Sequence, residues 1–135
     1  MPYAILRFQK RKAGGVAACE RHNERKKEAY KSNPDIDMER SKDNYHLVNP
    51  PRYTYKKEIN RMVAEAGCRT RKDSVMMVET LITASPEFMN SLPPKEQKAY
   101  FTMALDFISE RVGEKNILSA VVHMDERTPH MHLCF

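Results

Sequence analysis

The C-terminal run of the chain alternates in a way that favours a β-hairpin with one polar and one apolar face. The apolar stretch 117–122 predicts a strand, and the turn-rich stretch 125–129 can fold a second strand back against it. Because successive side chains of a strand point to opposite sides of the sheet, His130 and His132 share one side. The opposite side carries the apolar residues Met131, Leu133 and Phe135.

Three of the chain's five histidines lie in this segment. His123 follows the first strand, so the hairpin can bring its imidazole to those of His130 and His132. Three converging neutral imidazoles are the ligand set of a divalent metal site with an open position. We therefore predict a metal site formed by these histidines; the alternative is an exposed polar hairpin. Asp125 and Glu126 lie beside them, in a turn where acidic residues are common in any case.

The rest of the chain alternates helical and strand-like segments. Strands are predicted over 3–9, 45–48 and 74–83. Helices are predicted over 16–30, 55–66 and 94–112, with a further capped start at 85–88. A basic turn is expected over 10–15, which contains two adjacent glycines.

These elements predict an α/β (α+β) fold with a largely antiparallel central sheet and helices packed on one face. The apolar stripe within 94–112 is expected to cover the apolar face of the hairpin, which leaves the other face open for the site. A chain of 135 residues suits one domain. Because an apolar, strand-like run continues to Phe135 with no turn or cap, we expect residues 1–135 to be an N-terminal fragment of a longer domain.

Basic charge is concentrated at the start of the chain. The first thirty residues hold eight basic and three acidic residues, which alone accounts for the net charge of +5. Clustered basic charge favours binding to phosphate backbones, and a solvated basic helix face is the plainer alternative. No apolar run approaches the ~20 residues of a membrane span, and the start lacks a signal-peptide pattern. Three scattered cysteines argue against a disulfide framework or a cysteine zinc site, and favour a reducing cytoplasm.

Three motifs, in their order and spacing, resemble the MobV (Mob/Pre) family of plasmid mobilisation relaxases, which belong to the HUH endonuclease group. His22-Asn23-Glu24-Arg25 resembles the H-N-x-R motif of the family. Asn44-Tyr45 resembles the second motif, although His46 stands where an acid usually follows. The segment from His123 to His132 is similar to the H-x-D-E…P-H-x-H signature. The N-terminal segment also fits, through Tyr3, Arg7, Gln9 and Lys12-Ala13-Gly14.

The resemblance implies a relaxase (Mob/Pre) catalytic domain over 1–135. Such an enzyme nicks one strand at a plasmid transfer origin by transesterification, keeps the 5′ phosphate covalently attached, and can religate the strand. It implies Mn²⁺ or Mg²⁺ held by His123, His130 and His132 as a Lewis acid. In the MobV group the histidine of the first motif is the nucleophile, so the resemblance assigns that role to His22, with Tyr45 as the fallback.

The remaining roles follow from the resemblance and from position. Glu126 is the best candidate to orient the nucleophile, with a metal contact as the alternative role, and Asp125 is the next. On a helix, Arg25 would share a face with His22 and could neutralise charge on the phosphorus. The expected DNA contacts are Arg7, Lys12, Asn23, Asn44, Arg71 and Lys72.

The implied partner is transfer-origin DNA, as a single strand or hairpin, and a conjugation coupling protein is a further expected partner. The implied location is the bacterial cytoplasm. Two other classes stay open at this point. One is a non-catalytic module that binds single-stranded or hairpin DNA. The other is a small metal-dependent phosphodiesterase, which would leave the basic N-terminal segment unexplained.

Overall fold

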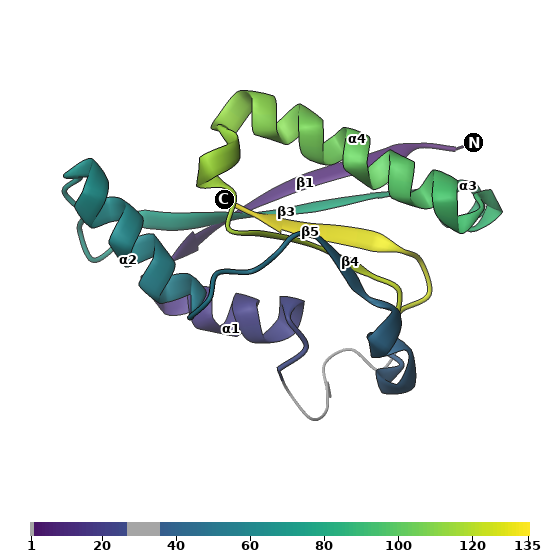
Figure 1. The fold of residues 1–135 in the computed structure, drawn as a ribbon, viewed down its shortest axis with the longest axis horizontal. Helices are drawn as coiled ribbons and strands as arrows, with labels where there is room; N and C mark the ends of the chain where they lie inside the picture. Colours follow the sequence, from purple (N-terminus) through teal and green to yellow (C-terminus); the bar gives the residue numbers. More distant parts are fainter. Residues whose placement is uncertain (1, 27–35) are drawn as a thin grey trace.

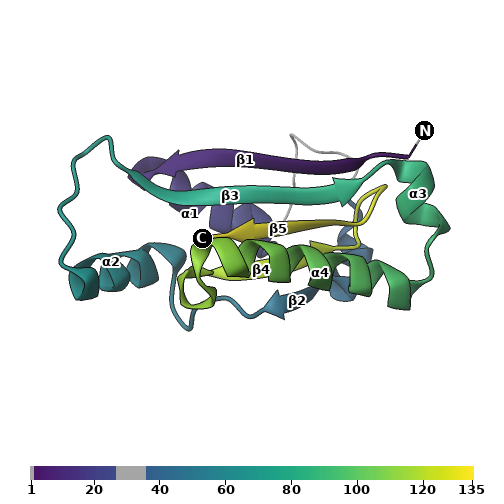
Figure 2. The same ribbon diagram turned by 90° about the horizontal axis from the view of Figure 1, so that it is seen from above.

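A single antiparallel sheet organises the chain. The computed structural model describes residues 2–26 and 36–135, and within them the sheet has five strands in the order β1-β3-β5-β4-β2 (Figures 1 and 2). The strands are β1 (Ala4–Lys12), β2 (Tyr45–Val48), β3 (Val75–Ala84), β4 (Ser119–His123) and β5 (His130–Cys134). The central pair β4 and β5 is the predicted hairpin, with His123 opposite His130. The predicted α+β class and antiparallel sheet are confirmed.

Helices cover both faces of this sheet, which corrects the expectation that they pack on one face. The α-helices are α1 (Ala13–Asn23), α2 (Tyr55–Ala66), α3 (Pro86–Ser91) and α4 (Pro94–Val112). Short 3₁₀ helices cover η1 (Met38–Asp43) and η2 (Glu114–Asn116). In Figure 1, α3 and α4 lie on one side of the sheet and α1 and α2 on the other. None of the helices in the described ranges has a stretch long and apolar enough to span a membrane.

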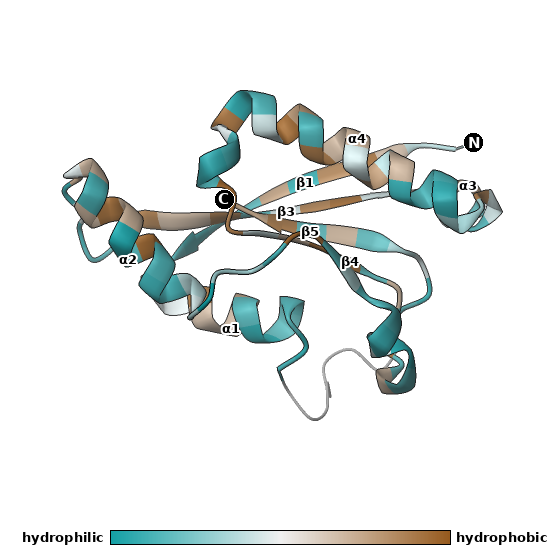
Figure 3. Ribbon diagram, in the orientation of Figure 1, coloured by the Kyte–Doolittle hydropathy of each residue, from teal (hydrophilic) through white to brown (hydrophobic). Residues whose placement is uncertain are grey.

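The apolar face of the hairpin packs against α4, as its sequence pattern predicts. One core cluster joins α4 to alternate residues of the two strands: Phe101, Ile108, Ala120, Val122, Met131 and Leu133. Figure 3 shows apolar positions of α4 interrupted by polar ones, the pattern of a helix with one apolar stripe. The helix ends at Gly113, whose φ of 91° lies in the region that favours glycine.

On the opposite face, α1 and α2 cover only one end of the sheet. A second buried cluster holds them there: Val16, Cys19, Tyr55, Ile59, Met77, Leu118 and Cys134. From this end α1 runs back under the sheet toward the hairpin turn, so its last residues reach the histidines. The face predicted to be open is therefore partly covered, and the covering helix brings the first motif to the third.

Two predicted boundaries near the first motif were wrong. The turn expected over 10–15 does not form, because β1 pairs with β3 as far as Lys12 and α1 begins at Ala13. The helix predicted over 16–30 ends at Asn23, and residues 27–30 lie outside the described residues. Arg25 has a φ of 52°, and the Lys26 N–H donates to the Arg21 carbonyl at 2.9 Å. This left-handed turn closes the helix as a Schellman motif does.

Candidate metal centre

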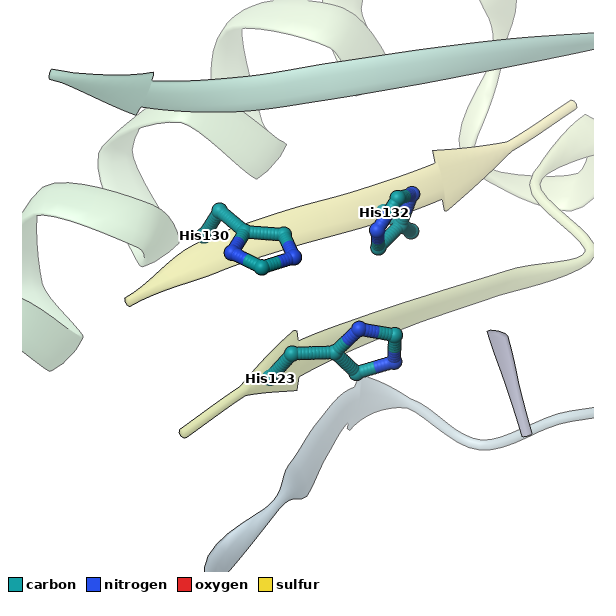
Figure 4. A group of neighbouring side chains, drawn as sticks. All are labelled: His123, His130 and His132. Atoms are coloured by element: carbon teal, nitrogen blue, oxygen red, sulfur yellow. The ribbon is translucent and has the colours of Figure 1, made fainter. Parts of the chain in front are cut away.

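The hairpin brings its three histidines together on one side of the sheet. The ring centroids of His123 and His132 are 4.7 Å apart, those of His130 and His132 are 5.0 Å apart, and those of His123 and His130 are 5.3 Å apart. Each ring offers a nitrogen that lies within 4.8 Å of the other two. Figure 4 shows all three side chains projecting from the same side of β4 and β5. The convergence predicted from strand periodicity is present.

The outer nitrogen of each imidazole bonds to a fixed acceptor. His123 Nε2 donates to the Asn23 carbonyl at 2.7 Å, and His130 Nδ1 donates to the Thr128 carbonyl at 2.8 Å. His132 Nδ1 donates to Glu79 Oε1 at 3.0 Å. Because a carbonyl or carboxylate oxygen can only accept, each bond places the proton on the outer nitrogen. The inner nitrogens of His123 and His132 then carry a free lone pair, which is the form that binds a metal, whereas the inner nitrogen of His130 lies 3.0 Å from Glu126 Oε2.

Two of the inner nitrogens are buried polar atoms without a hydrogen-bond partner. These are His123 Nδ1 and His132 Nε2. Burying a polar atom without a hydrogen-bond partner costs free energy. Two such atoms that face one point therefore indicate a ligand-binding site. Burial is the main cause that lowers the pKa of His132, to about 4, so its ring is neutral near pH 7. The donor set therefore fits a divalent metal ion.

The two acidic residues of the turn point in different directions. Glu126 Oε2 lies 3.0 Å from His130 Nε2 and 3.7 Å from His123 Nδ1, so Glu126 faces the histidines. Asp125 is buried, and its oxygens accept from Arg25, Ser41 and Asn44. Burial alone would raise the pKa of Asp125, but these hydrogen bonds hold it well below its usual range. Glu126 is therefore the carboxylate that faces the site. Asp125 instead connects Arg25, Ser41 and Asn44 to the hairpin turn.

His22 lies at the end of α1 beside the cluster. Its ring centroid is 5.7 Å from that of His132 and 6.2 Å from that of His123. It lines a pocket of about 300 Å³ together with Leu81, Thr83, Glu126, Thr128, His130 and His132. Burial, followed by the nearby charge of Arg25, lowers the pKa of His22. A neutral imidazole therefore faces the same pocket as two of the three clustered histidines.

Arg25 reaches the site from the turn after α1, which corrects its predicted place on a shared helix face. Its Nε and Nη2 donate to the two Asp125 oxygens at 2.8 and 2.9 Å. Its Nη2 also donates to Glu126 Oε2 at 2.9 Å, and its Nη1 donates to the His22 carbonyl at 3.0 Å. Arg25 therefore links the end of α1 to both acidic residues of the hairpin turn.

The second motif serves the structure of the site from the far edge of the sheet. Tyr45 pairs with Val122 and packs in the α4 cluster, on the face opposite the histidines. This position disfavours Tyr45 as the fallback nucleophile. Asn44 bonds Asp125 through Nδ2 and the Met124 N–H through Oδ1, so both ends of its amide are used within the protein.

Glu24 joins the first motif to the second. Its Oε1 lies 2.6 Å from Nε2 of His46. His46 is the residue that stands where the family motif usually has an acid. Its Oε2 accepts from Ser119 Oγ at 3.0 Å and from the Tyr55 hydroxyl. An acidic residue in place of His46 would be repelled by Glu24, whereas the histidine and the carboxylate form a complementary pair.

The predicted DNA contacts separate into three groups. Arg7 is exposed on the site face of β1, opposite Leu81, which in turn pairs with His132. Lys12 and the exposed pair Arg71 and Lys72 lie near the start of β3, at the end of the sheet away from the histidines. Asn23 is buried, and its Nδ2 lies 3.4 Å from two cysteine sulfurs, which corrects its predicted DNA contact. Of these, only Arg7 is both exposed and paired with a residue that lines the pocket, Leu81.

Sequence reasoning missed Glu79, Leu81 and Thr83, which reach the site from β3. Leu81 and Thr83 line the pocket, and Glu79 binds His132. Glu79 is the only charged residue between Val75 and Ala84. A lone acid within an otherwise uncharged strand is the signal that could have identified it, because a carboxylate that is largely removed from solvent requires partners.

Known proteins with similar sequences carry a common description. The family model of the plasmid recombination enzymes, Mob_Pre, matches residues 1–135. A plasmid recombination enzyme of Bacillus thuringiensis is 44% identical over 132 residues, which are 97% of this chain and 29% of that protein. A type 2 plasmid recombination enzyme of Staphylococcus aureus is 41% identical over 136 residues, covering 98% of this chain and 32% of that protein. The chain thus spans about a third of the length of these relatives.

Solved structures agree with the sequence relatives. The Mn-bound MobM relaxase domain (MOBV; Mob_Pre), in complex with oriT DNA of plasmid pMV158, matches with a TM-score of 0.90 and 39% identity. That match covers 98% of this chain and 69% of the solved one. A second Mn-bound complex of the same domain with a 22-nucleotide oriT DNA gives a TM-score of 0.88 at 38% identity. The chain belongs to the Mob/Pre family of plasmid recombination enzymes, whose MOBV relaxase fold it shares.

Proposed function

We propose that this chain forms the catalytic part of a plasmid mobilisation relaxase that nicks one strand at a transfer origin. The observation that carries the proposal is the pocket in which His22 faces the histidine cluster, where two buried ring nitrogens lack a partner. Related domains have been solved with Mn and oriT DNA bound, which supports the same ligands here. The reaction is expected in the bacterial cytoplasm, and a conjugation coupling protein stays a predicted partner.

His123, His130 and His132 would hold Mn²⁺ or Mg²⁺ through the inner nitrogens described above. When bound, the ion supplies Lewis-acid polarisation of the scissile phosphate. The three outer hydrogen bonds fix the orientation of the rings, so the chain itself prepares the ligand set.

His22 is our choice for the nucleophile. The neutral ring nitrogen attacks phosphorus, an N–P bond forms, and the P–O3′ bond breaks. The imidazole loses its N–H proton and the departing 3′ oxygen gains one, so a 3′ hydroxyl and a phosphoramidate result. Glu126 lines the same pocket and is the proposed proton acceptor. The reverse reaction religates the strand, because the energy of the phosphodiester is kept in the N–P bond.

Arg25 has a positioning role in this scheme. Its guanidinium is held by Asp125 and Glu126, and it also binds the His22 carbonyl. It can therefore set the distance between the nucleophile and the proton acceptor, and its charge favours the neutral form of His22. Arg7, exposed and paired with Leu81 of the pocket, is the proposed contact to a phosphate next to the scissile one.

The decisive test is formation of a covalent protein–DNA adduct. The chain is incubated with Mn²⁺ and supercoiled plasmids carrying candidate transfer origins, and adducts are resolved on a denaturing gel. His22→Ala should form no adduct, and Tyr45→Phe should form it as the wild type does. An adduct with His22→Ala but none with Tyr45→Phe would move the nucleophile to Tyr45. Chelation with EDTA should abolish nicking. Undiminished nicking in metal-free buffer would rule out the Lewis-acid role of the ion.

A further inference from the structure

Glu79 is a largely buried carboxylate in the middle of the sheet, 12% exposed, that binds residues of three elements. It lies on β3, between β1 and β5, with Gln9 and Cys134 as its register partners. Its Oε1 accepts from His132 Nδ1 of β5 at 3.0 Å. Its Oε2 accepts from Arg11 of β1 at 2.8 Å and from Cys19 of α1 at 3.0 Å. One oxygen is thus reserved for the histidine, and the other holds the carboxylate in place.

The support of His132 differs in kind from that of the other two histidines. His123 and His130 donate to main-chain carbonyls, whose positions are set by the backbone of α1 and of the hairpin turn. His132 donates to a flexible side chain, which could otherwise adopt several rotamers. Arg11 binds that side chain through both Nε and Nη2, at 3.2 and 2.8 Å, and so removes this freedom.

We propose that Glu79 is a positioning residue: it sets the tautomer and ring orientation of His132, and Arg11 in turn fixes Glu79. The proposal rests on the metal centre of the proposed function. It adds two residues behind His132: Glu79, which binds the histidine, and Arg11, which binds Glu79. Without the carboxylate, the His132 proton has no acceptor on the outer side and can move to Nε2, the nitrogen that faces the site. The ring would then present a proton in place of a lone pair.

The charge of Glu79 is also part of this role. Its Oε2 forms an ion pair with the Arg11 guanidinium at 2.8 Å, which favours the ionised carboxylate. The ionised carboxylate increases the basicity of the imidazole that it binds, which strengthens the ring as a metal ligand. A neutral amide in its place could accept the same proton without that effect.

Two variants separate the acceptor from the charge. Glu79→Ala removes both, and Glu79→Gln keeps a carbonyl oxygen in the same volume. Nitrogen-15 NMR of the metal-free chain reports which nitrogen of His132 carries the proton, and isothermal titration with Mn²⁺ reports the affinity. We expect Glu79→Ala to shift protons to Nε2 and weaken Mn²⁺ binding about 10–100-fold. Glu79→Gln should keep Nδ1–H and weaken binding by about threefold to tenfold.

Glu58→Gln is the matched control, because Glu58 forms an exposed pair with Arg61 on α2 away from the site. It should leave the His132 tautomer and the Mn²⁺ affinity unchanged. A folded Glu79→Ala chain that keeps Nδ1–H would overturn the proposal. If Glu79→Ala does not fold, Glu79→Leu, which fills a similar volume but lacks an acceptor, takes its place, and retention of Nδ1–H in that variant overturns the proposal instead. A wild-type chain that binds no Mn²⁺ refutes the metal centre, and the tautomer measurement then still decides the role of Glu79.

Discussion

The two faces of the β4–β5 hairpin are built from alternating residues of the same strands, yet they are stabilised in different ways. On one face Met131 and Leu133 are fully buried beneath α4 in a cluster of apolar side chains. On the other, His130 and His132 are held by directional contacts to specific partners, Thr128 and Glu126 for His130 and Glu79 for His132. The apolar face needs only matching volume, whereas the polar face needs particular atoms at particular positions.

This difference predicts where substitutions affect stability and where they affect ligand binding. An apolar contact is non-directional, so a side chain of similar volume can replace another at low cost. A buried polar atom that loses its partner keeps the cost of desolvation and gains nothing in return. Four experiments test the contrast, in order of decreasing expected effect on the free energy of unfolding or of Mn²⁺ binding.

Leu133→Ala on the apolar face should lower the free energy of unfolding by about 2–5 kcal/mol, because it leaves a cavity under α4. Urea denaturation measures this change. Leu133→Met, which conserves volume, should cost less than about 1.5 kcal/mol. The Mn²⁺ affinity of the folded fraction should stay at the wild-type value in both variants. A loss of affinity would mean that the two faces are not independent.

His130→Ala on the polar face should have the reverse profile. It removes one inner nitrogen of the cluster, so Mn²⁺ affinity and adduct formation should fall at least about a hundredfold, beyond the loss expected for an outer partner. The unfolding free energy should fall by about 1–2 kcal/mol, since the hydrogen bond to Thr128 and the contact with Glu126 are lost. Titration calorimetry and denaturation on the same sample compare the two values. Unchanged Mn²⁺ binding would remove His130 from the ligand set.

Asp125→Asn tests the buried carboxylate that accepts hydrogen bonds from Arg25, Ser41 and Asn44 near the polar face. The amide nitrogen must oppose at least one of the donors on Arg25, Ser41 and Asn44, so the unfolding free energy should fall by about 1–3 kcal/mol. Ser41→Ala removes a single donor and should cost about 1 kcal/mol. Denaturation curves of both variants give the comparison. If Asp125→Asn costs less than Ser41→Ala, the ion pair with Arg25 contributes little to stability.

Met103→Ser should have the smallest effect. Met103 is on α4 but 72% exposed, outside the buried cluster that α4 forms with the strands. The unfolding free energy should change by no more than about 0.5 kcal/mol. Thermal denaturation against the wild type measures it. A loss as large as that of Leu133→Ala would show that the exposed side of α4 also carries stability.

Much of the hairpin follows from local sequence. The alternation around His130 and His132, the turn before them and the helix over 94–112 are periodic patterns, and each occurs where it is predicted. The site residues contributed by other segments follow less well. Glu79 was missed, because its role appears only when β3 lies beside β5. Tyr45 was placed in the site by motif, and the sheet order puts it on the other face.

By itself the sequence determined which residues share a strand face and which histidines converge, because both depend on a spacing of a few residues. Only the tertiary structure decided the sheet order β1-β3-β5-β4-β2 and the return of α1 beneath it. Those contacts join segments about a hundred residues apart, such as Arg25 with Asp125, and local periodicity carries no information about them. The convergence of the candidate metal ligands could therefore be predicted from the chain, whereas the acceptors that orient each imidazole required the fold.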